Sequence, residues 1–162
     1  MTTSDLARYQ DPLTIQRVLL TAKTIAVVGL SGNALRASHF VGFYLQRHGY
    51  RVLPVNPRES EILGVRCYAS LQEVPEKVDI VNVFRAPSAL PEIAAQAVAI
   101  GAGCLWAQFN VINEDGARIA EQAGLAVVMD RCIKVEHARY VGRMHWLGFN
   151  TDRISSLRGG LQ

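Results

Sequence analysis

The sequence predicts an α/β fold, a doubly wound parallel sheet of about five strands with helices on both faces. Apolar runs that suit strands alternate along the chain with segments whose apolar residues recur at helical spacing. The strand candidates are continuous apolar runs, as expected when both faces of a sheet are covered. The first run ends at Gly29 and leads through a short polar loop into a helical pattern. That strand–loop–helix order is typical of nucleotide-binding α/β proteins.

The individual elements support this order. Asp11-Pro12 predicts a helix start before the first strand. Pro54 predicts that the second strand lies at a sheet edge or near the strand end, because proline donates no ladder hydrogen bond. Between 58 and 78 we expect an extended piece around Gly64 and a helical turn capped by Ser70. We expect strands at 24–29, 51–55, 79–84, 103–107 and 125–129, and helices at 38–48, from 88 to a stop at Gly101, from 113 to 123, and at about 132–140.

Length and composition indicate one soluble domain. The chain has 162 residues, of which 49% are hydrophobic and 19% charged, enough apolar material for a sizeable core. The net charge of +3 suits an anionic small ligand and is too weak to predict nucleic-acid binding. Three unpaired cysteines and the lack of a signal peptide or membrane span predict the cytoplasm. We divide the chain into a helical extension at 1–23, the domain at 24–143 and a tail at 144–162.

The loop after the first strand departs from the dinucleotide fingerprint. The spacing is Gly29-x-x-Gly32, with Ser31 where the fingerprint has its second glycine. Ser31 and Asn33 can donate hydrogen bonds to a phosphate, and Arg36 can supply positive charge. A tight strand–helix turn that binds nothing explains the same glycines equally well.

The end of the second strand carries no acidic residue. NAD sites usually place Asp or Glu there to hold the ribose hydroxyls, whereas this chain has Asn56-Pro57-Arg58 and reaches Glu59 only afterwards. Arg58 suits a phosphorylated ribose, either the 2′-phosphate of NADP or the 3′-phosphate of coenzyme A (CoA). A solvated loop charge is the simpler alternative for an isolated arginine.

Catalytic and metal patterns are missing from the sequence. Ser31 lies in a strand–helix turn but lacks the G-x-S-x-G elbow, and no acid–histidine relay is evident. No Cys/His pair has metal-ligand spacing. Trp106 and Phe109 are expected in the core or at an interface.

Several ordered motifs resemble the stand-alone CoA-binding proteins, which are similar to the N-terminal CoA-binding domain of the succinyl-CoA synthetase α subunit. The motifs are Val28-Gly29-Leu30-Ser31, Arg36-x-Ser38-His39, Val55-Asn56-Pro57, the strand 79–84 with Arg85 and Pro87 after it, and the segment 129–137. The resemblance runs from about residue 13 to 143. Each motif is short, and their order and spacing together carry the specificity.

The resemblance implies a Rossmann-like fold that binds CoA across the strand tips. The phosphates would lie against the first loop, and the ribose phosphate and adenine would lie near the second strand end. The implied cofactor-binding residues are Gly29, Leu30, Ser31, Gly32, Asn33, Arg36, Ser38, His39, Val55, Asn56, Pro57, Arg58, Phe84, Arg85, Pro87 and Gln108. Of these Gln108, and in addition Trp106 and Cys132, are weaker candidates deeper in the groove. For Cys132 a small buried thiol is favoured over a mixed disulfide with CoA.

The sequence therefore favours non-catalytic binding of CoA or an acyl-CoA, as a carrier, sensor or partner module. The synthetase's second α domain and β subunit do not fit in 162 residues. An NADP-linked oxidoreductase and an interaction module without a ligand stay open as alternatives. A homodimer or another protein partner also stays open.

Overall fold

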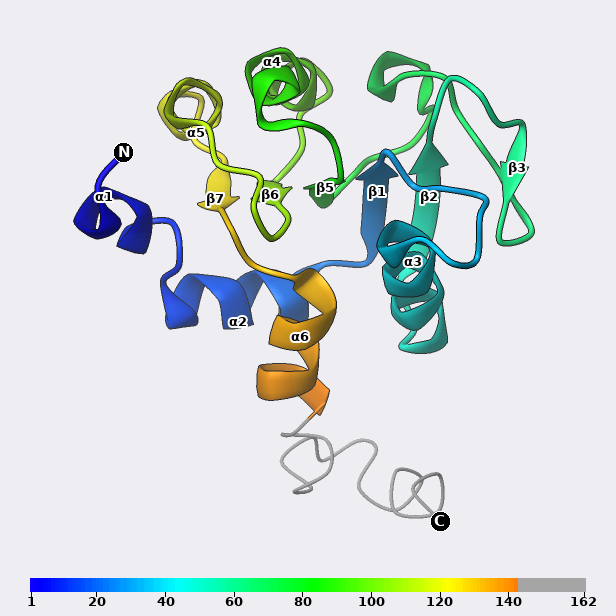
Figure 1. The fold of residues 1–162 in the computed structure, drawn as a ribbon, viewed down its shortest axis with the longest axis horizontal. Coiled ribbons are helices and arrows are strands. Elements are labelled where there is room, and N and C mark those ends of the chain that lie inside the picture. Colours follow the sequence, from blue (N-terminus) through cyan, green and yellow to red (C-terminus); the bar gives the residue numbers. More distant parts are fainter. Residues whose placement is uncertain (143–162) are drawn as a thin grey trace.

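The computed structural model describes residues 1–142 as one five-stranded parallel sheet between two layers of helices (Figure 1). The strands are β1 (Thr24–Val28), β2 (Arg51–Val55), β5 (Ile80–Val83), β6 (Cys104–Ala107) and β7 (Ala126–Val128). Their order in the sheet is β2-β1-β5-β6-β7, and every neighbouring pair is parallel. The predicted doubly wound α/β class is confirmed.

The two helical layers cover opposite faces of the sheet. Figure 1 shows one layer above the sheet and one below it. The upper layer contains α4 (Leu90–Ala99) and α5 (Glu114–Gln122), and the lower layer contains α2 (Pro12–Thr21), α3 (Ala37–Arg47) and α6 (Ile133–His137). The short helix α1 (Thr3–Ala7) precedes α2, and the π-helical turn η3 (Ala138–Gly142) follows α6.

Each face of the sheet has its own apolar core. Ala26, Leu53 and Leu105 face one cluster, which also holds Leu90 of α4 and Ala117 of α5. The other cluster contains Val27, Trp106 and Val128 from the sheet and Ile15, Leu19, Val41 and Leu45 from the lower helices. Consecutive strand residues point to opposite faces, so burial on both faces produces the continuous apolar runs seen in the sequence.

Local signals in the sequence account for most element ends. Asp11 accepts a hydrogen bond from the Thr14 N–H at the start of α2, and Asn113 accepts one from the Gly116 N–H at the start of α5. Pro54 lies in β2, which is the edge strand of the sheet, as predicted. Residues 143–162 lie outside the described part of the chain, and the predicted tail falls entirely among them.

The segment between β2 and β5 is a small excursion rather than part of the sheet. It contains the antiparallel pair β3 (Glu61–Ile62) and β4 (Val65–Arg66) around Gly64, then the 3₁₀ turn η1 (Leu71–Glu73) with Ser70 as its N-cap. A second 3₁₀ turn, η2 (Pro87–Ala89), leads into α4. No helix within residues 1–142 is long and apolar enough to cross a membrane.

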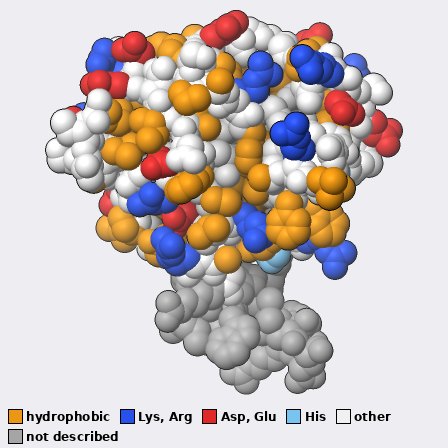
Figure 2. Space-filling view, viewed as in Figure 1, with side chains coloured by type: hydrophobic (Ala, Val, Ile, Leu, Met, Phe, Trp, Pro, Cys, Tyr) orange, Lys and Arg blue, Asp and Glu red, His pale blue; other side chains and the backbone are white. Residues whose placement is uncertain are grey.

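Hydrophobic and basic side chains lie together on one face of the molecule. Figure 2 shows hydrophobic side chains on the middle and lower parts of this face, with Lys and Arg side chains between them. Several large apolar side chains are exposed, among them Leu35, Phe40, Phe43, Phe109 and Val135.

Candidate functional site

The fold brings the predicted loops together at the carboxyl ends of the strands. From β1 the chain passes to β2 on one side and later crosses to β5 on the other side of β1. The connection after β1 therefore leads to one edge of the sheet, and the connection after β5 leads toward the opposite edge. In open parallel sheets this switch point is where ligands bind.

The glycine turn after β1 is packed against both neighbouring strands. The Gly29 N–H donates to the Val55 carbonyl of β2 at 2.9 Å, and Gly29 has a φ of +88°. A Cβ at Gly29 would collide with the backbone oxygen of Phe84 at the end of β5. The aliphatic part of Arg85 lies against the same glycine. Glycine is required here by both the backbone angle and the close approach of β5.

Polar side chains of the first loop hold the loop itself together. The Ser38 hydroxyl accepts a hydrogen bond from the Ser31 N–H at 3.0 Å, and the Ser31 hydroxyl accepts one from the Asn33 N–H at 3.0 Å. The Asn33 amide oxygen accepts one from the Leu35 N–H, and His39 Nδ1 lies 2.9 Å from the Ser31 carbonyl oxygen. These contacts fix the shape of the turn and occupy the N–H groups of Ser31, Asn33 and Leu35. Within the described residues, the Leu30 and Gly32 N–H groups are the donors of this loop that stay available to a ligand.

The N-terminus of α3 beside this loop has no capping side chain. Arg36 occupies the N-cap position without a side-chain capping bond, whereas α2 and α5 are both capped. Within residues 1–142, the N–H groups of Ala37, Ser38 and His39 donate no hydrogen bond. Free N–H groups, the positive end of the helix dipole and the adjacent Arg36 together suit an anion.

The end of β2 is tied to the glycine turn through Asn56. Its side-chain amide donates to the Leu30 carbonyl at 3.0 Å, and its side-chain oxygen accepts from the Arg58 N–H at 2.9 Å. Arg36, Arg58 and Arg85 are exposed, and none forms an ion pair within the described residues. Their charges are therefore available at this end of the sheet.

An acidic side chain nevertheless reaches the glycine turn. A Cβ at Gly32 would lie 2.7 Å and 2.8 Å from the two carboxylate oxygens of Glu59. The sequence places Glu59 beyond Pro57, and the turn at Asn56 folds it back over the loop. The expectation of no acid at the strand tip is correct for the strand itself, but not for the space beside Gly32.

A groove of about 930 Å³ lies next to this turn, on the β5–β6–β7 side of the switch point. This volume falls in the range of small-molecule sites. Its apolar wall is formed by Ala37, Val41, Phe84, Phe109, Val111 and Val135. Its polar lining comes from Arg85, Gln108, Arg131, Cys132, Glu136 and Arg139.

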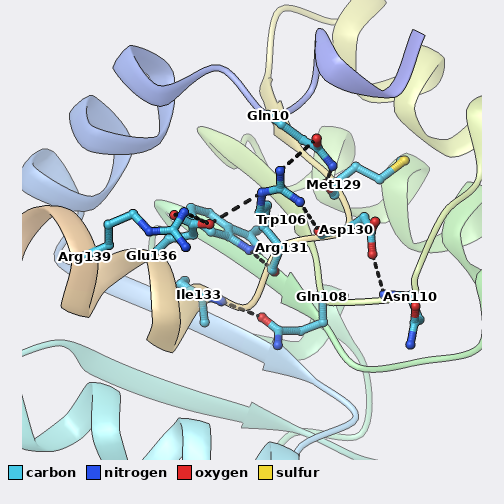
Figure 3. A network of polar contacts seen from close by, with 10 residues as sticks. All are labelled: Gln10, Trp106, Gln108, Asn110, Met129, Asp130, Arg131, Ile133, Glu136 and Arg139. Carbon is cyan, nitrogen blue, oxygen red and sulfur yellow. Dashed lines mark hydrogen bonds and ion pairs between the residues drawn. The ribbon is translucent and has the colours of Figure 1, made fainter. Parts of the chain in front are cut away.

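The floor of the groove is held by a network that starts at Gln108. Gln108 Oε1 accepts from the Ile133 N–H at 2.9 Å and from Asn82 Nδ2 at 3.1 Å (Figure 3 shows the first of these). Trp106 is fully buried, and its ring N–H donates to the Arg131 carbonyl at 2.8 Å. Both contacts attach the start of α6 to the end of β6, so they fix this wall of the groove.

A buried carboxylate lies among arginines at the same wall. Glu136 is 2% exposed, and its oxygens accept from Arg139 at 3.2 Å and lie 3.5 Å from Arg131 Nε. Arg131 also donates to Gln10 and to the Asp130 carbonyl (Figure 3). The Asp130 side chain accepts from the Asn110 N–H at 2.7 Å, which joins the loops after β6 and β7.

The predicted site residues fall into three groups. Phe84, Arg85 and Gln108 line the groove. Leu30 and Val55 are buried in the core, so only their backbone atoms face the loops. The remaining candidates lie in the loops and first helical turns that follow β1, β2 and β5, namely Gly29, Ser31, Gly32, Asn33, Arg36, Ser38, His39, Asn56, Pro57, Arg58 and Pro87.

One sequence interpretation needs correction, and several lining residues were missed, among them Glu136 and Arg139. Cys132 is half-buried and lines the groove, so it is not the fully buried thiol that was favoured. Trp106 is in the core, and Phe109 is 64% exposed, which leaves an interface as the place expected for it. Glu136 and Arg139 are not among the predicted site residues, although Glu136 belongs to the motif 129–137. Their i,i+3 spacing on a predicted helix is the signal that could have paired them.

The comparison with protein families identifies the chain. The family model described as "CoA binding domain" matches residues 23–138. The chain belongs to the CoA-binding domain family. The resemblance stated from the ordered motifs is thereby confirmed.

Relatives of similar length support this membership. The chain is 44% identical over 124 residues to the uncharacterised protein YneT of Bacillus subtilis (strain 168). The match covers 76% of the chain and 92% of YneT. A Thermus thermophilus structure is 41% identical with a TM-score of 0.77, covering 81% of this chain and 99% of that one. A hypothetical protein from Pyrococcus horikoshii OT3 is 38% identical with a TM-score of 0.79, covering 81% and 92%.

Longer relatives carry the domain as one part. The chain is 30% identical over 126 residues to Acetate–CoA ligase [ADP-forming] I of Archaeoglobus fulgidus, covering 71% of this CoA-binding domain chain but 18% of the ligase. It therefore spans less than a fifth of that enzyme. Within residues 1–142, no group of three His, Cys, Asp or Glu side chains could hold a metal ion.

Proposed function

We propose that this protein binds CoA or an acyl-CoA across the carboxyl ends of its strands. The observation that carries the proposal is the junction at the switch point, where the glycine turn and the uncapped start of α3 adjoin the groove. One end of this junction suits phosphates, and the other suits an elongated, largely uncharged chain. CoA combines these two chemistries in one molecule.

The parts of the ligand follow from this arrangement. Its diphosphate would accept hydrogen bonds from the loop 29–33 and from the first N–H groups of α3, beside Arg36. Its 3′-phosphate and adenine would lie near Asn56 and Arg58. Its pantetheine arm would cross Phe84 and Arg85 and enter the groove.

A binding role, as carrier, sensor or partner module, is favoured over catalysis. The groove offers no nucleophile paired with a base within the described residues, because Glu136 is held by two arginines. Burial raises the pKa of Cys67, and it raises that of Cys104 to about 12. A cytoplasmic location belongs to the same proposal, since three free cysteines suit a reducing compartment.

Calorimetric titration tests the ligand. CoA and acetyl-CoA should bind, and NAD and NADP should bind more weakly or not at all. The failure of both CoA species at millimolar concentration would overturn the proposal. Dephospho-CoA should bind about tenfold more weakly than CoA if Arg58 pairs with the 3′-phosphate, and Arg58→Ala should abolish that difference.

The two ends of α3 provide a matched pair of variants for the phosphate site. Arg36 and Arg47 are both exposed and without ion pairs, but Arg47 lies at the C-terminal end of the helix. Arg36→Ala should weaken CoA binding about tenfold, and Arg47→Ala should leave it unchanged. Equal effects would point to general electrostatic attraction rather than to a site.

A dinucleotide remains the second candidate because of Glu59. Its carboxylate beside Gly32 could accept hydrogen bonds from ribose hydroxyls, as acids do in NAD sites. Tighter binding of NAD or NADP than of CoA, lost in Glu59→Gln, would favour this candidate. If no nucleotide binds, an interaction module without a ligand becomes the better explanation.

A further inference from the structure

Gln108 presents an unused hydrogen-bond donor to the groove. The Ile133 N–H can only donate, so the Gln108 side-chain atom 2.9 Å from it is the oxygen. Asn82 Nδ2 donates to that same oxygen at 3.1 Å. The two donors fix the orientation of the amide, and Figure 3 shows its nitrogen directed away from Ile133.

The amide nitrogen of Gln108 has no partner of its own. Gln108 is only 5% exposed and lines the groove, and its Nε2 donates no hydrogen bond within residues 1–142. The nitrogen is not enclosed by the protein, so it opens onto the groove and suits a ligand that brings an acceptor oxygen.

Apolar side chains line the same groove. Val111 is 7% exposed in the groove wall, whereas Phe109 and Val135 are 64% and 46% exposed although they are large and apolar. A hydrocarbon chain lying between them would remove this surface from water.

The arginines of the groove wall are only partly neutralised by Glu136. Arg139 and Arg131 both contact the buried Glu136 carboxylate, and Arg131 is further held by Gln10. Arg139 contacts Glu136 through Nη1 alone, and Arg85 forms no ion pair within residues 1–142, so the groove keeps a net positive charge beside its apolar wall.

We propose that the groove takes the acylated end of an acyl-CoA thioester with an apolar acyl chain. The acyl carbonyl oxygen accepts a hydrogen bond from Gln108 Nε2, and the chain packs against Phe109, Val111 and Val135. Gln108 is thus a specificity residue for thioester over free thiol. This inference rests on the proposed function, that the protein binds CoA at this end of the sheet.

A ligand series tests it on the unaltered protein by calorimetric titration. Hexanoyl-CoA should bind at least tenfold more tightly than CoA, because each buried methylene adds about fourfold in affinity. The thioether S-hexyl-CoA has the same chain without the carbonyl oxygen, so it should bind about five- to tenfold more weakly than hexanoyl-CoA.

Variants then separate the two contacts. Phe109→Ala should remove most of the advantage of hexanoyl-CoA over CoA, and Phe43→Ala, an exposed phenylalanine outside the groove lining, should leave it intact. Gln108→Glu keeps the acceptor for Ile133 and loses the donor. It should weaken hexanoyl-CoA more than S-hexyl-CoA; thermal unfolding without ligand checks that it is folded, and the thioether comparison does not depend on it.

The outcomes distinguish this inference from the proposed function. Equal affinities for CoA, hexanoyl-CoA and S-hexyl-CoA would overturn the acyl site and leave CoA binding in place. Equal affinities for the two hexyl ligands would overturn the role of Gln108. Binding of none of the three would overturn the proposed function itself.

Discussion

At the scale of single residues, Gly29 is under two separate constraints. Its φ of +88° disfavours a side chain, and a Cβ would also meet the Phe84 backbone. Gly124 has the same φ of +88° with nothing within 4 Å of a Cβ position. The two glycines therefore separate the cost of backbone conformation from the cost of contact.

Gly29→Ala should be much more destabilising than Gly124→Ala. Gly124→Ala should lower the free energy of unfolding by about 1 kcal/mol, the usual cost of a left-handed alanine. Gly29→Ala should cost at least about 2 kcal/mol more, because β5 must also move. Urea unfolding of both variants measures the difference. Equal losses in the free energy of unfolding would show that β5 moves aside at no energetic cost.

The tyrosine at the start of β2 predicts a loss of stability at alkaline pH. Burial raises the pKa of Tyr50 to about 12, and its hydroxyl donates to the Leu19 carbonyl. In the unfolded chain tyrosine titrates near 10. Between pH 10 and 12 the unfolded state therefore binds fewer protons than the folded state, so the free energy of unfolding falls as pH rises.

Tyr50→Phe should flatten this pH dependence. The variant should be less stable than the parent protein at pH 8 by about 1 kcal/mol, since it loses the hydrogen bond to Leu19. From pH 10 to 12 its free energy of unfolding should fall less steeply than that of the parent, whose Tyr50 adds at most about 1.4 kcal/mol per pH unit. Denaturant titrations at several pH values give both slopes. Equal slopes would show that Tyr50 does not cause the loss of stability at alkaline pH.

At the scale of elements, the short helix α6 is held against the sheet by polar contacts. The helix has five residues, so its position depends on what its ends and side chains contact. Gln108 binds its first N–H group, and Glu136 binds Arg131 in the loop before it. These contacts hold one wall of the groove.

Glu136→Gln should destabilise the protein, and Glu114→Gln should not. Glu136 is 2% exposed and contacts two arginines, so the substitution leaves them without a buried counter-charge and should cost about 1–3 kcal/mol. Glu114 also contacts an arginine, Arg118, but on the surface, where a loss below about 0.5 kcal/mol is expected. Thermal and urea unfolding test both; similar losses would mean that the burial of Glu136 has no effect.

At the scale of the whole molecule, the sequence predicted the sheet well because its signals are local. The apolar runs, Pro54 on the edge strand and the N-cap at Asn113 each depend on neighbours in the chain. The groove depends on contacts between distant loops. The approach of Glu59 to Gly32, the burial of Glu136 and the exposure of Phe109 all follow from how those loops pack, and no local pattern encodes them.

The position of the groove predicts that one ligand bridges the two halves of the sheet. The turn that we propose for the phosphates lies between β1 and α3, whereas the groove is completed by the loops after β5, β6 and β7. A ligand that spans both should slow amide hydrogen exchange at 29–40 and at 108–111 and 131–136 together. The β3–β4 pair, away from the groove lining, serves as the internal control.

Each fragment of CoA should slow hydrogen exchange in only some of these segments. Adenosine 3′,5′-diphosphate should protect 29–40 and the turn at 56–58 but not the groove loops, because its phosphates suit the free N–H groups at the start of α3 and the charge of Arg58. Pantetheine should protect only the groove loops, and weakly, since it lacks charge. Intact CoA should bind more tightly than either fragment, because joining them removes the entropic cost of a second binding event. If CoA protected only the turn 29–40 or only the groove loops, the two would be separate sites. One ligand would then not bridge the switch point.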